Sequence, residues 1–95
     1  MGNVFAIDFE TYYDQNYNVA NLTPERYCAD EKFDPYMVAL VGQGLWWVGR
    51  PEEFQWDRLP KAPVFVAHNA RFDSAVFKAL QKKGFIPQWV SPCLL

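Results

Sequence analysis

The chain has 95 residues and a mass of 11.1 kDa, with 51% hydrophobic and 18% aromatic residues, which is typical of one small globular domain. Nine Lys and Arg against eleven Asp and Glu leave a formal net charge of −2. This balance excludes a protein that binds nucleic acid through a broad basic surface. Binding to nucleic acid therefore needs bound cations or a local pocket.

The sequence also argues against a disulfide framework, a Cys/His zinc site and a membrane segment. Cys28 and Cys93 lie far apart, and His68 is the single histidine. Asp8 interrupts the apolar start of the chain, and no apolar run approaches about 18 residues. We expect reduced thiols, a cytoplasmic location and no membrane partner.

The first third of the chain predicts a strand, a loop and a short helix. Residues 3–11 alternate large apolar side chains with small or acidic ones, which is the period of a strand. Residues 12–22 have neither a helical nor a strand period and indicate a surface loop. Thr23 is a good N-cap before Pro24, so a helix is expected to start there and to end near Asp30.

The middle of the chain predicts a hairpin, a helix and a further strand. Residues 36–42 and 45–48 are two apolar runs separated by a short turn, which is typical of a β-hairpin. A helix is expected to start at Pro51, with acids in its first turn, and to stop at Pro60. Residues 64–67 are predicted to form a strand.

The last third predicts the clearest helix. It starts after Asn69 as N-cap and ends at Gly84, and its apolar stripe consists of Phe72, Val76, Ala79 and Leu80. Residues 85–95 have an apolar end without a cap, and residues 92–95 are expected to form an unfinished element. The order of the predicted elements indicates an α/β fold with a mixed sheet and flanking helices.

Two acids on the first strand are the first candidate site. Asp8 and Glu10 point to the same face of the strand, so their Cβ atoms lie about 6–7 Å apart and their like charges raise each other's proton affinity. A divalent cation with oxygen ligands would neutralise both. The alternative is a strand end at which both acids face water.

A second candidate lies where the strand at 64–67 meets the following helix. Asn69 and Asp73 are four residues apart and project from the same side of that helix. The alternative for Asp73 taken alone is an acid that the helix dipole favours. If the strand at 64–67 lies parallel to the strand at 3–11, Asp73 joins Asp8 and Glu10, and three carboxylates converge.

The segments Phe5–Thr11 and Ala67–Asp73 closely resemble the first two motifs of the DEDD superfamily of 3'-to-5' exonucleases. Their separation and the elements between them also resemble that family. Residues 27–30 with Phe33 look like the stretch before the second strand in exonuclease domains of phage-type family A DNA polymerases. The resemblance implies a ribonuclease H-like α/β fold in one domain over residues 1–95.

The resemblance also implies an activity and a set of residues. Asp8, Glu10 and Asp73 would be the catalytic residues and the ligands of two Mg²⁺ or Mn²⁺ ions in a complete domain. Asp8 would bridge both ions, Glu10 would hold the ion that activates water, and Asp73 would serve the ion on the leaving-group side. Nucleic-acid binding is implied for Thr11, Asn69 and Phe72. The expected partners are single-stranded DNA 3' ends and a polymerase domain or a missing C-terminal segment.

The chain departs from the family in its third motif, a His or Tyr followed by a fourth Asp. Residues 85–95 contain none of these residue types. We therefore expect a domain truncated before that motif, with impaired metal binding and activity. The exposed C-terminal flank is expected to drive self-association through Phe85, Ile86, Trp89, Val90, Leu94 and Leu95.

Two other functions are compatible with the sequence. One is a non-catalytic nuclease-fold module that binds protein or nucleic acid, and the other is a ribonuclease H-type endonuclease. His68 is expected to have a structural hydrogen-bonding role, and Asp14 stands near the position at which family members often carry a Leu wedge. Several aromatics are suited to stacking on bases but are more typical of a core: Tyr12, Tyr13, Trp46, Trp47, Trp56 and Trp89.

Overall fold

Five strands form one mixed sheet in the computed structural model, which describes residues 3–60, 62–91 and 93–94. The strands are β1 (Val4–Thr11), β2 (Pro35–Gly42), β3 (Leu45–Gly49), β4 (Val64–Val66) and β5 (Cys93–Leu94), and their order is β3-β2-β1-β4-β5. β1 is antiparallel to β2 and parallel to β4, and β4 is parallel to β5. The predicted α/β class and mixed sheet are confirmed. The strand at 64–66 lies parallel and adjacent to the first strand, which is the condition under which Asp73 was expected to join the acids of that strand.

The predicted hairpin joins β2 and β3 through a two-residue turn. Gln43 and Gly44 have φ angles of 51° and 82°. Positive φ at both central residues is the turn geometry whose twist matches that of paired antiparallel strands. The turn therefore fixes the register, in which Gly42 lies opposite Leu45.

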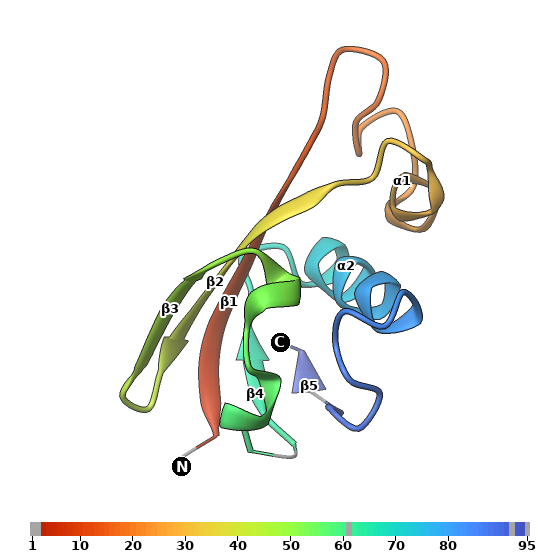
Figure 1. Ribbon diagram of the computed structural model, residues 1–95. Helices are drawn as coiled ribbons and strands as arrows, with labels where there is room; N and C mark the ends of the chain where they lie inside the picture. The colour runs from red at the N-terminus through yellow and green to blue at the C-terminus, as the bar shows by residue number, and fades with distance from the viewer. Residues whose placement is uncertain (1–2, 61, 92, 95) are drawn as a thin grey trace.

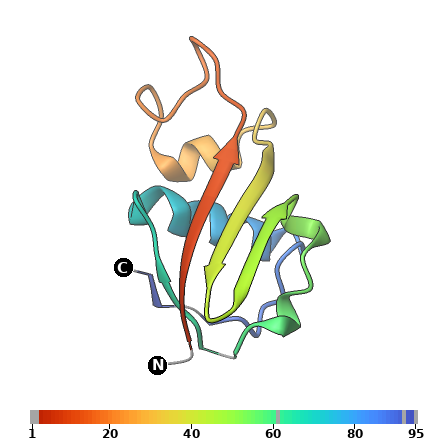
Figure 2. The ribbon, with the colours of Figure 1, turned by 90° about the vertical axis from the view of Figure 1, so that its left-hand side faces the viewer.

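The sheet has one covered face. Figure 1 shows helices α1 (Pro24–Ala29) and α2 (Ala70–Lys82) on the same side of the sheet, and Figure 2 looks onto the opposite face of β1, β2 and β3. Burial alternates along β1 as predicted: Phe5, Ile7 and Phe9 face the core, whereas Ala6 and Asp8 are exposed. This alternation places the two acids of β1 on the face that α2 does not cover.

Helix α1 has the predicted boundaries. Thr23 is its N-cap and accepts a hydrogen bond from the backbone N–H of Arg26, Pro24 is the first helical residue, and Asp30 is the C-cap. Residues 12–22 form the predicted loop, which projects from one end of the sheet (Figure 1). Tyr27 and Cys28 are the side chains with which α1 contacts the core.

The prediction of a helix from Pro51 to Pro60 is wrong. The structure has two short 3-10 turns instead, η1 (Pro51–Glu53) and η2 (Trp56–Arg58). The buried side chains are Pro51, Phe54, Trp56 and Leu59, and their spacing of three, two and three residues does not follow one helical stripe. The indole N–H of Trp56 donates to the carbonyl of Pro51 at 3.0 Å, and Phe54 packs edge-on against the Trp56 ring. Burial of the Phe54 and Trp56 rings therefore determines the local conformation, although the acids after Pro51 favour the start of a helix.

Helix α2 starts and ends as predicted. Asn69 caps it by accepting a hydrogen bond from the N–H of Phe72 at 3.2 Å, and Gly84 follows with a φ of 83°, which favours glycine. The buried stripe is shifted by about one residue from the prediction and consists of Asp73, Val76, Phe77 and Leu80. Phe72 and Ala79 lie at its edges.

The segment after α2 packs more tightly than predicted. Ile86 and Val90 are fully buried, so these two cannot belong to an exposed flank, whereas Phe85 and Trp89 are about half exposed. The side chains of Leu94 and Leu95 lie outside the described residues. β5 adds a short strand beside β4, where an unfinished element was expected.

Two further findings concern membrane-spanning helices and the thiol of Cys28. Within the described ranges no helix is long and apolar enough to span a membrane. The Cys28 thiol is free and buried, and burial raises its pKa to about 11, so it is a poor nucleophile and metal ligand at neutral pH. The side chain of Cys93 is outside the described residues.

Candidate functional site

The acids of β1 lie on one face, as predicted. Asp8 is opposite Ala39 and Glu10 is opposite Met37 on β2, and both acids point away from α2. Asp8 is exposed and Glu10 is half-buried. Burial raises the pKa of Glu10, and the charge of Asp8 and a hydrogen bond between the two side chains raise it further. Two like charges therefore meet on this face of β1 and repel each other.

Asp73 reaches the same end of β1 from the first turn of α2. β4 pairs with residues 4–6 of β1 and ends at Val66, so among the described residues the following part of β1 has no strand on that side. The carboxylate of Asp73 occupies this place, and its Oδ1 accepts a hydrogen bond from the N–H of Phe9 at 3.3 Å. Phe9 lies between Asp8 and Glu10 in the chain, so the structure brings the three predicted acids together.

The environment of Asp73 opposes its ionisation. The side chain is only 2% exposed, and burial raises its pKa to about 6. The charges of Asp8 and Glu10 add to this rise, whereas the hydrogen bond from Phe9 and the nearby His68 oppose it. A buried acid whose pKa is raised by two other acids is typical of a functional site, because a fold gains nothing from such repulsion.

The three acids are not arranged as a ready set of metal ligands. Over residues 3–60, 62–91 and 93–94, no group of three or more His, Cys, Asp or Glu side chains lies close enough together to hold a metal ion. One oxygen of Asp73 is engaged with the amide of Phe9. The donor chemistry, three carboxylates, suits a hard divalent cation. To ligate it, however, the side chains must turn.

A pocket of about 340 Å³ lies beside Glu10. It contains all three residues predicted to bind nucleic acid, Thr11 from the end of β1 and Asn69 and Phe72 from the start of α2. Its other walls come from the loop at 12–22 and from α1, and they include Tyr13, Asn18, Val19 and Tyr27. The pocket combines aromatic surface with a hydroxyl and two amides, next to the acids.

Tyr27 was not predicted to be a site residue, yet it contacts the residues that form several walls of the pocket. Its ring is fully buried and packs edge-on against Phe72. Its hydroxyl lies 2.6 Å from Oγ1 of Thr11 and donates to the carbonyl of Tyr12. Tyr27 thus links α1 to the end of β1 and to α2. A tyrosine in a short amphipathic helix carries no sequence signal that separates this role from ordinary packing.

Asp14 organises the loop that forms the outer wall of the pocket. Its carboxylate accepts hydrogen bonds from the Tyr12 hydroxyl and from the backbone N–H groups of Asn16 and Tyr17. These hydrogen bonds lower the pKa of Asp14, and the one from the Tyr12 hydroxyl has the largest effect. Tyr17 stacks on Tyr27 with ring centres 4.4 Å apart. The structure therefore gives Asp14 a role in ordering the loop.

Two expectations about individual side chains are wrong. His68 is exposed and makes no hydrogen bond to the described part of the chain, so it has no structural hydrogen-bonding role there. Of the aromatics expected in the core, Trp56 is buried and Trp47 is half-buried, but the others are exposed: Tyr12, Tyr13, Trp46 and Trp89. Tyr13 and Trp46 are more than 70% exposed.

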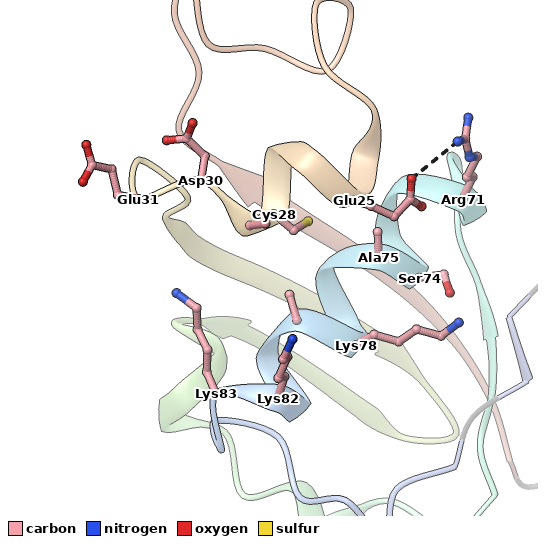
Figure 3. Close-up of a pocket in the computed structure, with 12 residues that line it drawn as sticks. Glu25, Cys28, Asp30, Glu31, Arg71, Ser74, Ala75, Lys78, Lys82 and Lys83 are labelled. Carbon is pink, nitrogen blue, oxygen red and sulfur yellow. Dashed lines mark ion pairs between the residues drawn. The ribbon is translucent and has the colours of Figure 1, made fainter.

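A larger cavity, of about 780 Å³, lies between α1 and α2, and none of the predicted site residues lines it (Figure 3). Its floor is made of small residues such as Ala75, and Lys78 and Lys82 extend along one side. Arg71 and Glu25 form an ion pair of 3.6 Å at one end. Both side chains are largely exposed, so this pair contributes little stability.

Comparisons with protein-family models, with curated proteins and with solved structures find no match to this chain. The residues of the site are therefore the basis for any statement about function.

Proposed function

We propose that the protein is a DEDD-type 3'-to-5' exonuclease with a ribonuclease H-like fold, related to the proofreading domains of phage-type DNA polymerases. The observation that carries this proposal is the position of Asp73. Its carboxylate, from the second predicted motif, bonds to the amide of Phe9, between the two acids of the first motif. Sequence segments about sixty residues apart thus supply three carboxylates to one end of β1.

The proposed substrate is the 3' end of single-stranded DNA. Asp8, Glu10 and Asp73 would hold Mg²⁺ or Mn²⁺, which would activate water and stabilise the departing oxygen in phosphodiester hydrolysis. Thr11 and Asn69 present polar groups to the terminal nucleotide, and Phe72 presents a ring for stacking. The pocket beside Glu10 keeps that nucleotide next to the carboxylates.

A low activity is expected of these 95 residues by themselves. Residues 74–95 contain no Asp, Glu, His or Tyr, so the part of the chain after the second motif offers neither the fourth acid nor the His or Tyr that would position water. Loss of one preorganised group commonly costs a factor of about 10²–10³ in rate. A polymerase domain or a further segment of chain is the proposed source of the missing groups.

A non-catalytic nuclease-fold module is the second candidate. It is favoured by the lack of a ready cluster of three metal ligands in the described ranges and by the engagement of Asp73 with a backbone amide. In that case the pocket beside Glu10 would bind nucleic acid without cutting it. The two candidates differ in whether the three acids affect hydrolysis.

The test is degradation of a 5'-labelled single-stranded oligonucleotide with Mg²⁺ or Mn²⁺, by the 95-residue chain and by a longer protein that supplies the third motif. We expect stepwise shortening from the 3' end, slow for the chain and faster for the longer protein, and its loss in Asp8→Ala. Asp57→Asn, which changes an exposed acid outside the site, is the matched control. Equal digestion with Asp8, Glu10 and Asp73 all replaced by Ala would disprove the site. Binding of the oligonucleotide without any shortening would favour the non-catalytic module.

A further inference from the structure

One edge of the sheet is a bare strand. β3 is the outermost strand and pairs only with β2 (Figure 2). Within the described chain, no other backbone hydrogen bond involves residues 45–49. An unpaired strand edge presents a row of N–H and C=O groups that can pair with another strand.

The geometry of the hairpin shows which groups of β3 are free. Gly42 and Leu45 flank a two-residue turn, so they form a hydrogen-bonded pair. Bonded and non-bonded pairs alternate in an antiparallel ladder, so Trp47 also bonds to β2, whereas Trp46 and Val48 do not. The N–H and C=O groups of Trp46 and Val48 therefore point to the open edge.

The side chains at this edge do nothing to block pairing. Residues 35–49 contain no Lys, Arg, Asp or Glu, and β3 has neither a proline nor a bulge. Charged residues, proline and bulges are the usual means by which natural edge strands avoid pairing. Trp46 and Val48 lie on the open face of the sheet, 73% and 42% exposed. The edge is thus apolar and uncharged as well as unpaired.

We propose that β3 pairs with β3 of a second copy of this chain, antiparallel and about a two-fold axis at Trp47. In this register Trp46 lies opposite Val48 of the second copy, and Val48 lies opposite Trp46 of the second copy. Each of these two pairs exchanges two hydrogen bonds, so all of the free groups are used. The same register places a Trp and a Val side by side across the new boundary, an apolar pair that stabilises antiparallel strands.

The second copy is favoured over another extended partner because the edge matches itself. On β3 the two residues with free N–H and C=O groups, Trp46 and Val48, are separated by one residue. In an antiparallel second copy the same two residues lie in reverse order, so the free groups of the two copies face each other. The pairing extends the sheet sideways and leaves Asp8 and Glu10, on β1, uncovered. It is therefore independent of the proposed nuclease activity. Five paired residues cover less than the roughly 800 Å² per partner of a typical stable interface, so the dimer is weak and depends on concentration.

The test is sedimentation velocity from micromolar to millimolar concentration. We expect reversible dimerisation of the wild type, at least about tenfold weaker in Val48→Pro and in Val48→Lys. Val48→Pro removes an N–H that β2 does not use, so the hairpin keeps its ladder. Val48→Lys introduces a charge at the boundary and leaves the backbone unchanged.

Two control variants separate this edge from other surfaces. Val66→Lys makes the same change at a similarly exposed position on the open face of β4, and it tests stacking of two open faces. Trp89→Lys tests association through the segment after α2. Both variants are expected to dimerise like the wild type.

Amide hydrogen exchange gives a second readout. The amides of Trp46 and Val48 should become protected as the concentration rises, whereas the Trp47 amide should be protected at every concentration. A strict monomer at millimolar concentration would overturn the proposal. So would a dimer that persists in both Val48 variants, or one that is lost equally in Val66→Lys or Trp89→Lys.

Discussion

Replacement of Asp73 by Asn is expected to stabilise the protein. The pKa of Asp73 is about 6 in the folded chain, against an ordinary value of 3.8. Because the raised pKa means that the folded state holds this proton more tightly, ionisation of Asp73 destabilises the fold. The cost is absent below pH 3.8 and complete above pH 6. A shift of about two units corresponds to at most about 3 kcal/mol at pH 8 and to less than about 1 kcal/mol at pH 4.

Asp73→Asn removes the charge while keeping the shape of the side chain and an oxygen that accepts the hydrogen bond from Phe9. We expect its Tm to exceed that of the wild type by on the order of 10 °C at pH 8, with a much smaller difference at pH 4. Thermal unfolding followed by circular dichroism measures this, with Asp57→Asn as the control for loss of an exposed acid. If Asp73→Asn were destabilised equally at both pH values, Asp73 would be a structural acceptor and the reasoning would fail.

Three further changes test the surroundings of the site. Tyr27→Phe removes the hydroxyl that contacts Thr11, so it should lower the free energy of unfolding by about 1–3 kcal/mol in urea denaturation, unlike Tyr36→Phe at an exposed position. Asn69→Ala removes the cap of α2 and should cost about 1 kcal/mol in the same assay; no change would mean that the cap is dispensable. The pKa of Asp14 is lowered in the folded chain, so its ionised carboxylate stabilises the loop at neutral pH. This stabilisation is lost as the pH falls through the pKa that Asp14 has in the folded chain. Lower amide protection factors, that is, exchange faster relative to an unstructured chain at the same pH, are therefore expected at residues 16–17 at acid pH and in D14N at neutral pH, and equal protection would contradict the role of Asp14.

Local patterns in the sequence predict most of the fold. The alternation along residues 3–11, the cap Thr23 before Pro24, and the helix that starts after Asn69 depend on neighbours in the chain, and all three appear as expected. The conformation of the segment from Pro51 to Pro60 does not depend on chain neighbours alone, because the rings of Phe54 and Trp56 pack against each other and against Trp47 and Phe77 in the core. Burial of Ile86 and Val90 likewise depends on contacts that local periodicity does not contain.

The same distinction applies to the candidate site. Proximity of Asp73 to Asp8 and Glu10 follows from a parallel strand pair and a helix that starts beside it, which sequence patterns indicate. The positions of the residues that form the pocket wall do not follow from these sequence patterns. Tyr27 reaches the end of β1 because Asp14 and a stack of tyrosines fix the path of the loop, and these contacts join residues that no simple period relates.

We propose that Asp8, Glu10 and Asp73 together bind a divalent cation. Titration with paramagnetic Mn²⁺, followed by the loss of NMR signals, tests it most directly, because signal loss marks the residues nearest the ion whether or not the chain is active. We expect weak binding, with the earliest loss at Asp8, Phe9, Glu10 and Asp73 as Mn²⁺ is added, and this loss is abolished in Asp8→Ala. Signal loss spread over exposed acids such as Glu31, or unchanged in Asp8→Ala, would contradict it.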